Sequence, residues 1–278
     1  MRTRFYYALR IYLHKKRGLL RLVQILRAYI VLGPLRKPMI LYYQKVNKND
    51  PIKTDTHPIF PDAIQDQIVK RLDDVGYAHM GKLPEKYITQ ILEYCEADKL
   101  RHYWNPHKNC EAVNRLCRNS KIVGIARQYL GAEPILWLSQ MKWSLPLDDD
   151  FSNSHASIYR EPIQYDGYSF HYDVLDFKSL TLFVYLTDVD ADSGAHMTIE
   201  RTSNKTLKEI YKIILNEDTA QRKFGDRIKV ISGKKGTAFF EETSSYHKVT
   251  VCKKRRLILS IDYVLQRKPP PERPLLPS

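Results

Sequence analysis

The chain has 278 residues, which is enough for one large domain with a well-buried core and does not indicate two. Its formal charge of +14 is uneven, because residues 1–48 contain 12 Lys or Arg and neither Asp nor Glu. The rest of the chain is nearly neutral, so the basic composition gives no reason to expect specific nucleic-acid binding by the domain. The four cysteines lack CxxC spacing and no secretory signature is present, which predicts reduced thiols in a cytosolic protein.

Residues 1–49 are predicted to form a basic amphipathic N-terminal arm. Its apolar stretches are interrupted by Arg and Lys before they reach the roughly 20 residues that span a bilayer. We expect a helix that ends at Gly33-Pro34 and whose apolar face consists of Leu19, Leu22, Val23, Leu26, Tyr29, Ile30 and Val31. Two interpretations stay open. The helix lies on an anionic membrane surface, where the protein would be peripheral, or it packs on the domain with a solvated basic face.

Residues 50–265 are predicted to form the main domain, which begins with a helical preamble over residues 60–132. Apolar residues recur at helical spacing over residues 61–75 and 83–97, and residues 111–130 fit one or two further helices. Gly131 follows as a natural left-handed cap. We expect these helices to cover a sheet.

The jelly-roll core is predicted over residues 134–265. Short runs of β-branched and aromatic residues alternate with turn-forming residues, which is typical of a mainly β, α+β fold built on a double-stranded β-helix (jelly roll, cupin-like). A helical stretch over residues 206–215 interrupts the strands. The Pro-rich tail, residues 266–278, is predicted to be extended and exposed. The expected strands are residues 134–145, 169–174, 180–186, 195–199, 228–231, 237–240, 247–251 and 257–265.

His171, Asp173 and His247 are the candidate catalytic metal ligands. Residues two apart on a strand point to the same face, so His171 and Asp173 can bind one ion together, and a distant histidine completes the set. Two imidazoles and one carboxylate on one side of a metal leave open positions opposite, as in non-haem Fe(II) oxygenases.

The sequence around these ligands resembles the phytanoyl-CoA dioxygenase family of Fe(II)/2-oxoglutarate oxygenases. The resemblance lies in SFHYDVLDFKSLTLFVYLTDVDADSGAHMTI, residues 169–199, and KKGTAFFEETSSYHKVTVCKKRRLILSIDY, residues 234–263. It implies a jelly-roll hydroxylase that uses Fe(II), O2 and 2-oxoglutarate as cosubstrate. Residues 200–204 read ERTSN where members of that family commonly read P-G-S-H, in a loop that borders the substrate side.

The cosubstrate carboxylate needs a buried cationic partner. Arg255 and Arg256 are neighbours, and strand alternation allows only one of them to face inward. We choose Arg256, because its spacing to Tyr263 matches the Arg-then-aromatic spacing of the family. Further cosubstrate contacts are predicted for Thr181, Tyr185 and Lys142, with β-core filling or an exposed strand lysine as the alternative interpretations.

Two functions from different classes follow. The first is a dioxygenase that hydroxylates a small-molecule, lipid-linked or carrier-linked substrate; the intact carboxylate of Asp173 favours hydroxylation. The alternative is a catalytically inactive jelly-roll binding or scaffold protein that is tethered by its basic arm.

Overall fold

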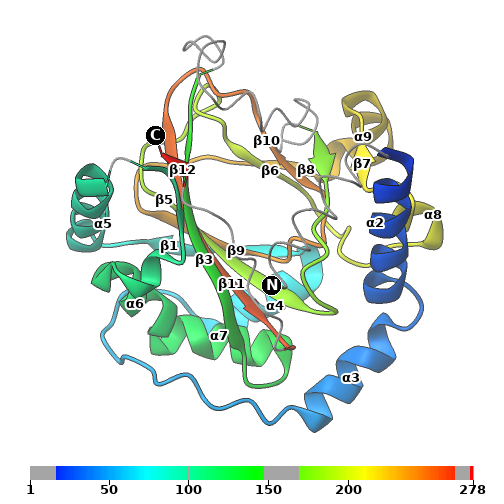
Figure 1. The fold of residues 1–278 in the computed structure, drawn as a ribbon, viewed down its shortest axis with the longest axis horizontal. Coiled ribbons are helices and arrows are strands. Elements are labelled where there is room, and N and C mark those ends of the chain that lie inside the picture. The colour runs from blue at the N-terminus through cyan, green and yellow to red at the C-terminus, as the bar shows by residue number, and fades with distance from the viewer. Residues whose placement is uncertain (1–16, 99, 147–168, 267–275, 278) are drawn as a thin grey trace.

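The computed structural model describes residues 17–98, 100–146, 169–266 and 276–277, and these form two antiparallel sheets that face each other with helices around them (Figure 1). The larger sheet is seven-stranded, in the order β1 (Tyr77–Lys82), β9 (Thr237–Glu241), β5 (Ser179–Tyr185), β11 (Arg256–Val264), β3 (Ile135–Ser144), β2 (Leu100–Trp104) and β12 (Leu276–Pro277). The smaller sheet is five-stranded, in the order β7 (Ile214–Leu215), β4 (Phe170–His171), β10 (His247–Val249), β6 (His196–Ile199) and β8 (Ile228–Ile231).

This arrangement confirms the predicted α+β jelly roll. Each of the eight expected runs contains a strand of one of the two sheets, because β-branched and aromatic residues recur wherever a strand is half-buried. One run is much shorter than predicted: β4 covers only Phe170–His171, so Asp173 follows the strand rather than lying within it.

The predicted helical preamble, residues 60–132, contains helices, but β1 and β2 of the larger sheet also lie within it and were not predicted. It contains α4 (Gln65–Val75), α5 (Glu85–Asp98), the 3-10 turn η1 (Pro106–Lys108), α6 (Glu111–Arg118) and α7 (Ser120–Leu130). Their apolar faces pack against the outer face of the larger sheet, where Leu182, Leu259 and Ile261 are fully buried in the same core. Gly131 ends α7 in the left-handed conformation, with a φ of 73° and its N–H donated to the Arg127 carbonyl.

Smaller helices lie at the other end of the molecule, on the outer side of the smaller sheet. They are α8 (Leu207–Ile210), α9 (Glu217–Phe224) and the 3-10 turn η4 (Gly225–Arg227). The predicted helical stretch over residues 206–215 is therefore only partly helical. Its last two residues form β7, which pairs with β4 and extends the smaller sheet.

Leu276 and Pro277 of the tail are extended, but they also belong to a sheet, which was not predicted for a Pro-rich segment. These residues pair as β12 with β2, opposite His102 and Leu100. Proline has no N–H to donate, but an edge strand leaves one side unpaired and tolerates it. The other residues of the tail after Gln266 lie outside the described part of the chain.

The arm contains two helices, α2 (Arg17–Leu32) and α3 (Arg36–Val46). One side of α2 packs on the domain, because Ala28, Val31 and Leu32 are buried in a core with Phe170 and other residues of the smaller sheet. Figure 1 shows α2 beside this sheet, near α8 and α9. Most side chains of the predicted apolar face point away from the domain. Those that are exposed are Leu22, Val23, Leu26, Tyr29 and Ile30.

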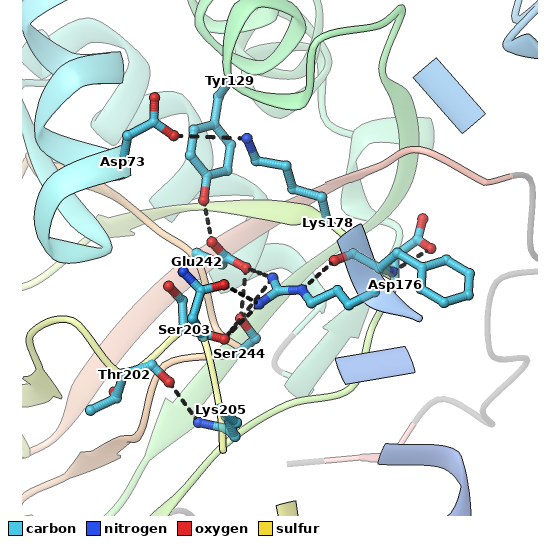
Figure 2. Close-up of polar contacts among 12 residues, drawn as sticks. Asp73, Tyr129, Asp176, Lys178, Thr202, Ser203, Lys205, Glu242 and Ser244 are labelled. Carbon is cyan, nitrogen blue, oxygen red and sulfur yellow. Dashed lines mark hydrogen bonds and ion pairs between the residues drawn. The ribbon is translucent and has the colours of Figure 1, made fainter. Parts of the chain in front are cut away.

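A buried ion pair anchors α3 to the jelly roll. The Arg36 guanidinium pairs with the Glu242 carboxylate, and both side chains are less than a tenth exposed. Arg36 also donates to the carbonyls of Phe177, at 2.8 Å, and Ser203, at 2.6 Å. Figure 2 shows the hydroxyls of Tyr129 and Ser244 directed at the Glu242 carboxylate, to which both donate.

Candidate metal centre

A cavity of about 470 Å³ lies between the two sheets. The larger sheet contributes side chains that alternate along β11, because every second residue of a strand points to the same face. These are Arg256, Ile258, Ser260 and Asp262. The smaller sheet contributes His196 and His247, and the cavity also contacts His171 and Asp173.

The three predicted metal ligands come together on one wall of this cavity. His171, Asp173 and His247 each offer a ligand atom, and these atoms lie within 4.8 Å of one another. Pairing of β4 with β10 places the two histidines directly opposite each other, with ring centroids 4.5 Å apart. Asp173 is held by its own backbone, whose N–H donates to the Thr243 carbonyl at 2.8 Å.

Backbone carbonyls fix the orientation of both imidazoles. The Nδ1 of His171 lies 2.9 Å from the Ser169 carbonyl oxygen, and the Nδ1 of His247 lies 3.0 Å from that of Ser245. A carbonyl can only accept, so a neutral ring in this position carries its proton on Nδ1. The Nε2 lone pair of each histidine is then available for a metal, as in most protein sites where the second nitrogen is anchored.

The electrostatics of the cluster favour the neutral, ligating form of His247. Burial and then the neighbouring His171 lower the pKa of His247 to about 4, so its ring is uncharged at neutral pH. Its Nε2 lies 3.7 Å from a carboxylate oxygen of Asp173, whose side chain is 42% exposed. The cluster therefore combines the neutral His247 ring and the His171 imidazole with an Asp173 side chain that faces the open cavity.

Arg256, the arginine chosen from its spacing to Tyr263, faces the cavity and is buried. Its guanidinium donates to the Gly194 carbonyl and, at 3.1 Å, to the Ser144 hydroxyl. Arg255 points to the other side, where it is exposed over the Trp143 ring at 5.2 Å. Lys142 also lines the cavity, on neighbouring β3 and opposite Ile258, so the structure brings it to the same end as Arg256.

The other two predicted cosubstrate contacts are placed differently. Thr181 lines the cavity but pairs with Asp262, six residues along β11 from Arg256, which is about 20 Å at the rise of a strand. It cannot share one small carboxylate with Arg256. Tyr185 does not line the cavity; its hydroxyl donates to the Ile231 carbonyl and accepts a hydrogen bond from the backbone N–H of His196. Its position fits the alternative interpretation, which was core filling.

Sequence reasoning missed Asp262. Its carboxyl faces the cavity, accepts a 2.7 Å hydrogen bond from the Thr181 hydroxyl and is buried, and burial raises its pKa to about 7. A signal existed, because RLILSIDYV places Asp262 on the same face as Arg256 and Ser260. A buried carboxyl at this end of the cavity can hydrogen-bond a hydroxyl or amine of a bound molecule.

A buried His–Glu pair lies beside His247, with His196 on β6 and Glu241 on β9. The Nε2 of His196 lies 2.6 Å from a carboxylate oxygen of Glu241, and the His196 ring stacks on that of His247 at 5.6 Å and 14°. The sequence did not connect His196 with the ligands. The connection depends on β6 and β10 being neighbours, and no spacing along the chain shows this.

Several solved structures have a similar fold. EctD from S. alaskensis, crystallised with bound Fe, has a TM-score of 0.53 and 16% identity, with 82% of this chain and 88% of that chain covered. The epimerase SnoN, in complex with Fe3+, alpha ketoglutarate and nogalamycin RO, has a TM-score of 0.52 and 14% identity, covering 72% and 82%. EvdO2 from Micromonospora carbonacea var. aurantiaca, complexed with 2-oxoglutarate, has a TM-score of 0.52 and 11% identity, covering 72% and 91%.

These likenesses establish the fold. No protein-family model matches the chain, and no curated protein matches it in sequence. The resemblance to the phytanoyl-CoA dioxygenase family therefore stays a prediction, and the case for an activity depends on the geometry of the cavity.

Proposed function

We propose that the protein is an Fe(II)- and 2-oxoglutarate-dependent oxygenase, related to the phytanoyl-CoA dioxygenase family, that hydroxylates a small-molecule, lipid-linked or carrier-linked substrate. The observation that carries the proposal is one cavity containing both a His-Asp-His cluster and a buried inward-facing arginine. The neighbours with the same fold include proteins crystallised with iron and 2-oxoglutarate, which supports the assignment of the two groups.

The donor set fits ferrous iron. Two imidazole nitrogens and one carboxylate oxygen form the three-ligand face used by non-haem Fe(II) oxygenases, and the exposed side of Asp173 leaves room for further ligands. His171, Asp173 and His247 would hold the ion. When bound, Fe(II) would supply O2 activation coupled to decarboxylation of 2-oxoglutarate to succinate and CO2.

The cavity also fits a dicarboxylate. Arg256 presents a permanently charged, two-pronged partner, and its burial strengthens the pairing with a carboxylate. Lys142 would add a second cation at the same end. Asp262 and Thr181 at the far end, with the aromatic side chains of Trp104 and Trp137, would contact the substrate.

The two adjacent arginines provide a matched pair of variants. Arg256→Ala should raise the 2-oxoglutarate concentration needed for half-maximal succinate formation by about tenfold to a hundredfold, the effect of losing a charge-assisted contact of about 1.5–3 kcal/mol. Arg255→Ala should change it little, because that side chain is exposed. Titrating 2-oxoglutarate against both variants checks this. The reverse pattern would mean that the cosubstrate does not bind at the inner face of β11.

Succinate formation tests the proposed function directly. Purified protein, Fe(II), 2-oxoglutarate and O2 should give succinate, slowly even without the substrate, and omission of Fe(II) should stop it. A protein that binds Fe(II) tightly but gives no succinate with any candidate substrate would instead fit the alternative of a jelly-roll binding or scaffold protein.

A further inference from the structure

The exposed apolar side chains of the protein are concentrated on the arm. Among the residues that the structure describes, 14 large hydrophobic side chains are exposed, and nine of them lie between Leu22 and Val46. Surface apolar residues scattered singly are normal, whereas a concentrated patch marks an interaction site. Two more, Leu207 and Tyr211, belong to α8 and the residue after it, and α8 contacts α2.

Five of these side chains make one face of α2, called here the outer face: Leu22, Val23, Leu26, Tyr29 and Ile30, each 42–58% exposed. The spacing of Leu22, Leu26 and Ile30 places them one above the other along the helix. The opposite side is the one that packs on the domain, through Ala28, Val31 and Leu32. A surface helix normally presents polar residues to water, so an apolar outer face indicates a partner.

The positive charge of the arm indicates which kind of partner binds the outer face. Residues 1–48 contain 12 Lys or Arg and no acidic residue, and Arg21 on α2 and Lys37 and Lys45 on α3 are exposed. Leu, Ile and Tyr interleaved with basic residues are typical of helices that lie in the headgroup region of anionic bilayers. The cores of protein interfaces are instead depleted in lysine. No helix in the described residues is long and apolar enough to cross a bilayer.

We propose that α2 lies with its outer face on an anionic lipid surface, with the exposed lysines of α3 over the headgroups. Binding of α2 and α3 to the membrane would also place the jelly-roll domain at the membrane, because contacts of both helices attach them to that domain. Arg27 donates to the Val174 carbonyl at 2.8 Å, next to Asp173, and Arg36 forms the buried ion pair with Glu242. Docking would therefore fix the orientation of the jelly roll on the membrane. It does not depend on oxygenase activity.

Point variants of the full chain test this better than deletion of the arm, since deletion would leave Glu242 buried without Arg36. The double variant Leu26→Glu/Ile30→Glu places two charges on the outer face. The matched control is Val230→Glu/Val251→Glu, which alters side chains of similar exposure outside the patch. Each protein is sedimented with vesicles of phosphatidylcholine alone or of phosphatidylcholine with phosphatidylserine.

We expect the wild type and the control to bind the anionic vesicles, less as salt is raised, and the outer-face variant to bind at least about tenfold more weakly. Equal binding of wild type and outer-face variant, or equal binding to neutral vesicles, would overturn the proposal. If the melting temperature fell for the outer-face variant and not for the control, the proposal would be overturned, and the outer face would be covered by another part of the same chain. Conversion of a wild-type dimer to a monomer in sedimentation analysis would identify a second copy instead.

Discussion

Replacing Asp173 by alanine is expected to reduce succinate formation to the background of the assay while the protein stays folded. The change removes one of three candidate ligands from the cluster of side chains that could hold a metal ion, and no second such cluster occurs among the residues that the structure describes. It leaves the fold intact because Asp173 is 42% exposed and lies after a two-residue strand rather than in the core. His171→Ala and His247→Ala should behave alike.

The measurement is succinate release at saturating Fe(II) and 2-oxoglutarate, with the melting temperature taken for each protein. Asp226→Ala, an exposed aspartate that does not line the cavity, is the control and should keep wild-type turnover. Turnover by Asp173→Ala at the wild-type rate would show that the cluster is not the catalytic centre.

Arg36→Ala is expected to lower the free energy of unfolding by about 3–5 kcal/mol, since it leaves the Glu242 carboxylate buried without its cation. Arg115→Ala removes an arginine from an exposed ion pair with Glu111 and should change stability little. Urea unfolding of both variants measures the difference. In a double-mutant cycle with Glu242→Ala, the two losses should not add, because each variant breaks the same pair. Equal effects of Arg36→Ala and Arg115→Ala would show that the ion pair does not hold the arm.

The same pair predicts a pH dependence. Burial alone would raise the pKa of Glu242, but the Arg36 guanidinium and the hydroxyls of Ser244 and Tyr129 outweigh it and lower the pKa below its usual 4.5. A lowered pKa contributes stability that is present above pH 4.5 and is lost as pH falls through the folded pKa. Glu242→Gln should therefore be less stable at neutral pH and lose less stability on acidification.

The strands could be predicted from local periodicity, whereas the candidate ligands were chosen from the His171–Asp173 spacing together with the resemblance to a family. Alternating apolar residues located the strands. Two-residue alternation allowed only one of Arg255 and Arg256 to face inward, and the spacing to Tyr263 that resembles the family decided for Arg256. Alternation did not show where along β5 the cavity ends, so Thr181 and Tyr185 were given one role although only Thr181 reaches the cavity. The role of each cavity residue beyond its position stays a prediction.

Long-range pairings could not be predicted. Arg36 and Glu242 are 206 residues apart, and an arginine in a basic arm has no local feature that distinguishes a buried anchor from a solvated charge. The arm helix is apolar on two opposite sides, so periodicity alone could not show which side packs. The stacking of His196 on His247 depends on the order of strands in the smaller sheet.

Anaerobic titration of the protein with Fe(II) and 2-oxoglutarate tests the central claim most directly, because it reports both groups in one site without any knowledge of the substrate. A metal-to-ligand charge-transfer band in the visible should develop only when Fe(II) and 2-oxoglutarate are both present. It should be absent from Asp173→Ala and should need more 2-oxoglutarate in Arg256→Ala. Failure of the wild type to develop the band at saturating concentrations of both would contradict the assignment of this cavity as an iron and 2-oxoglutarate site.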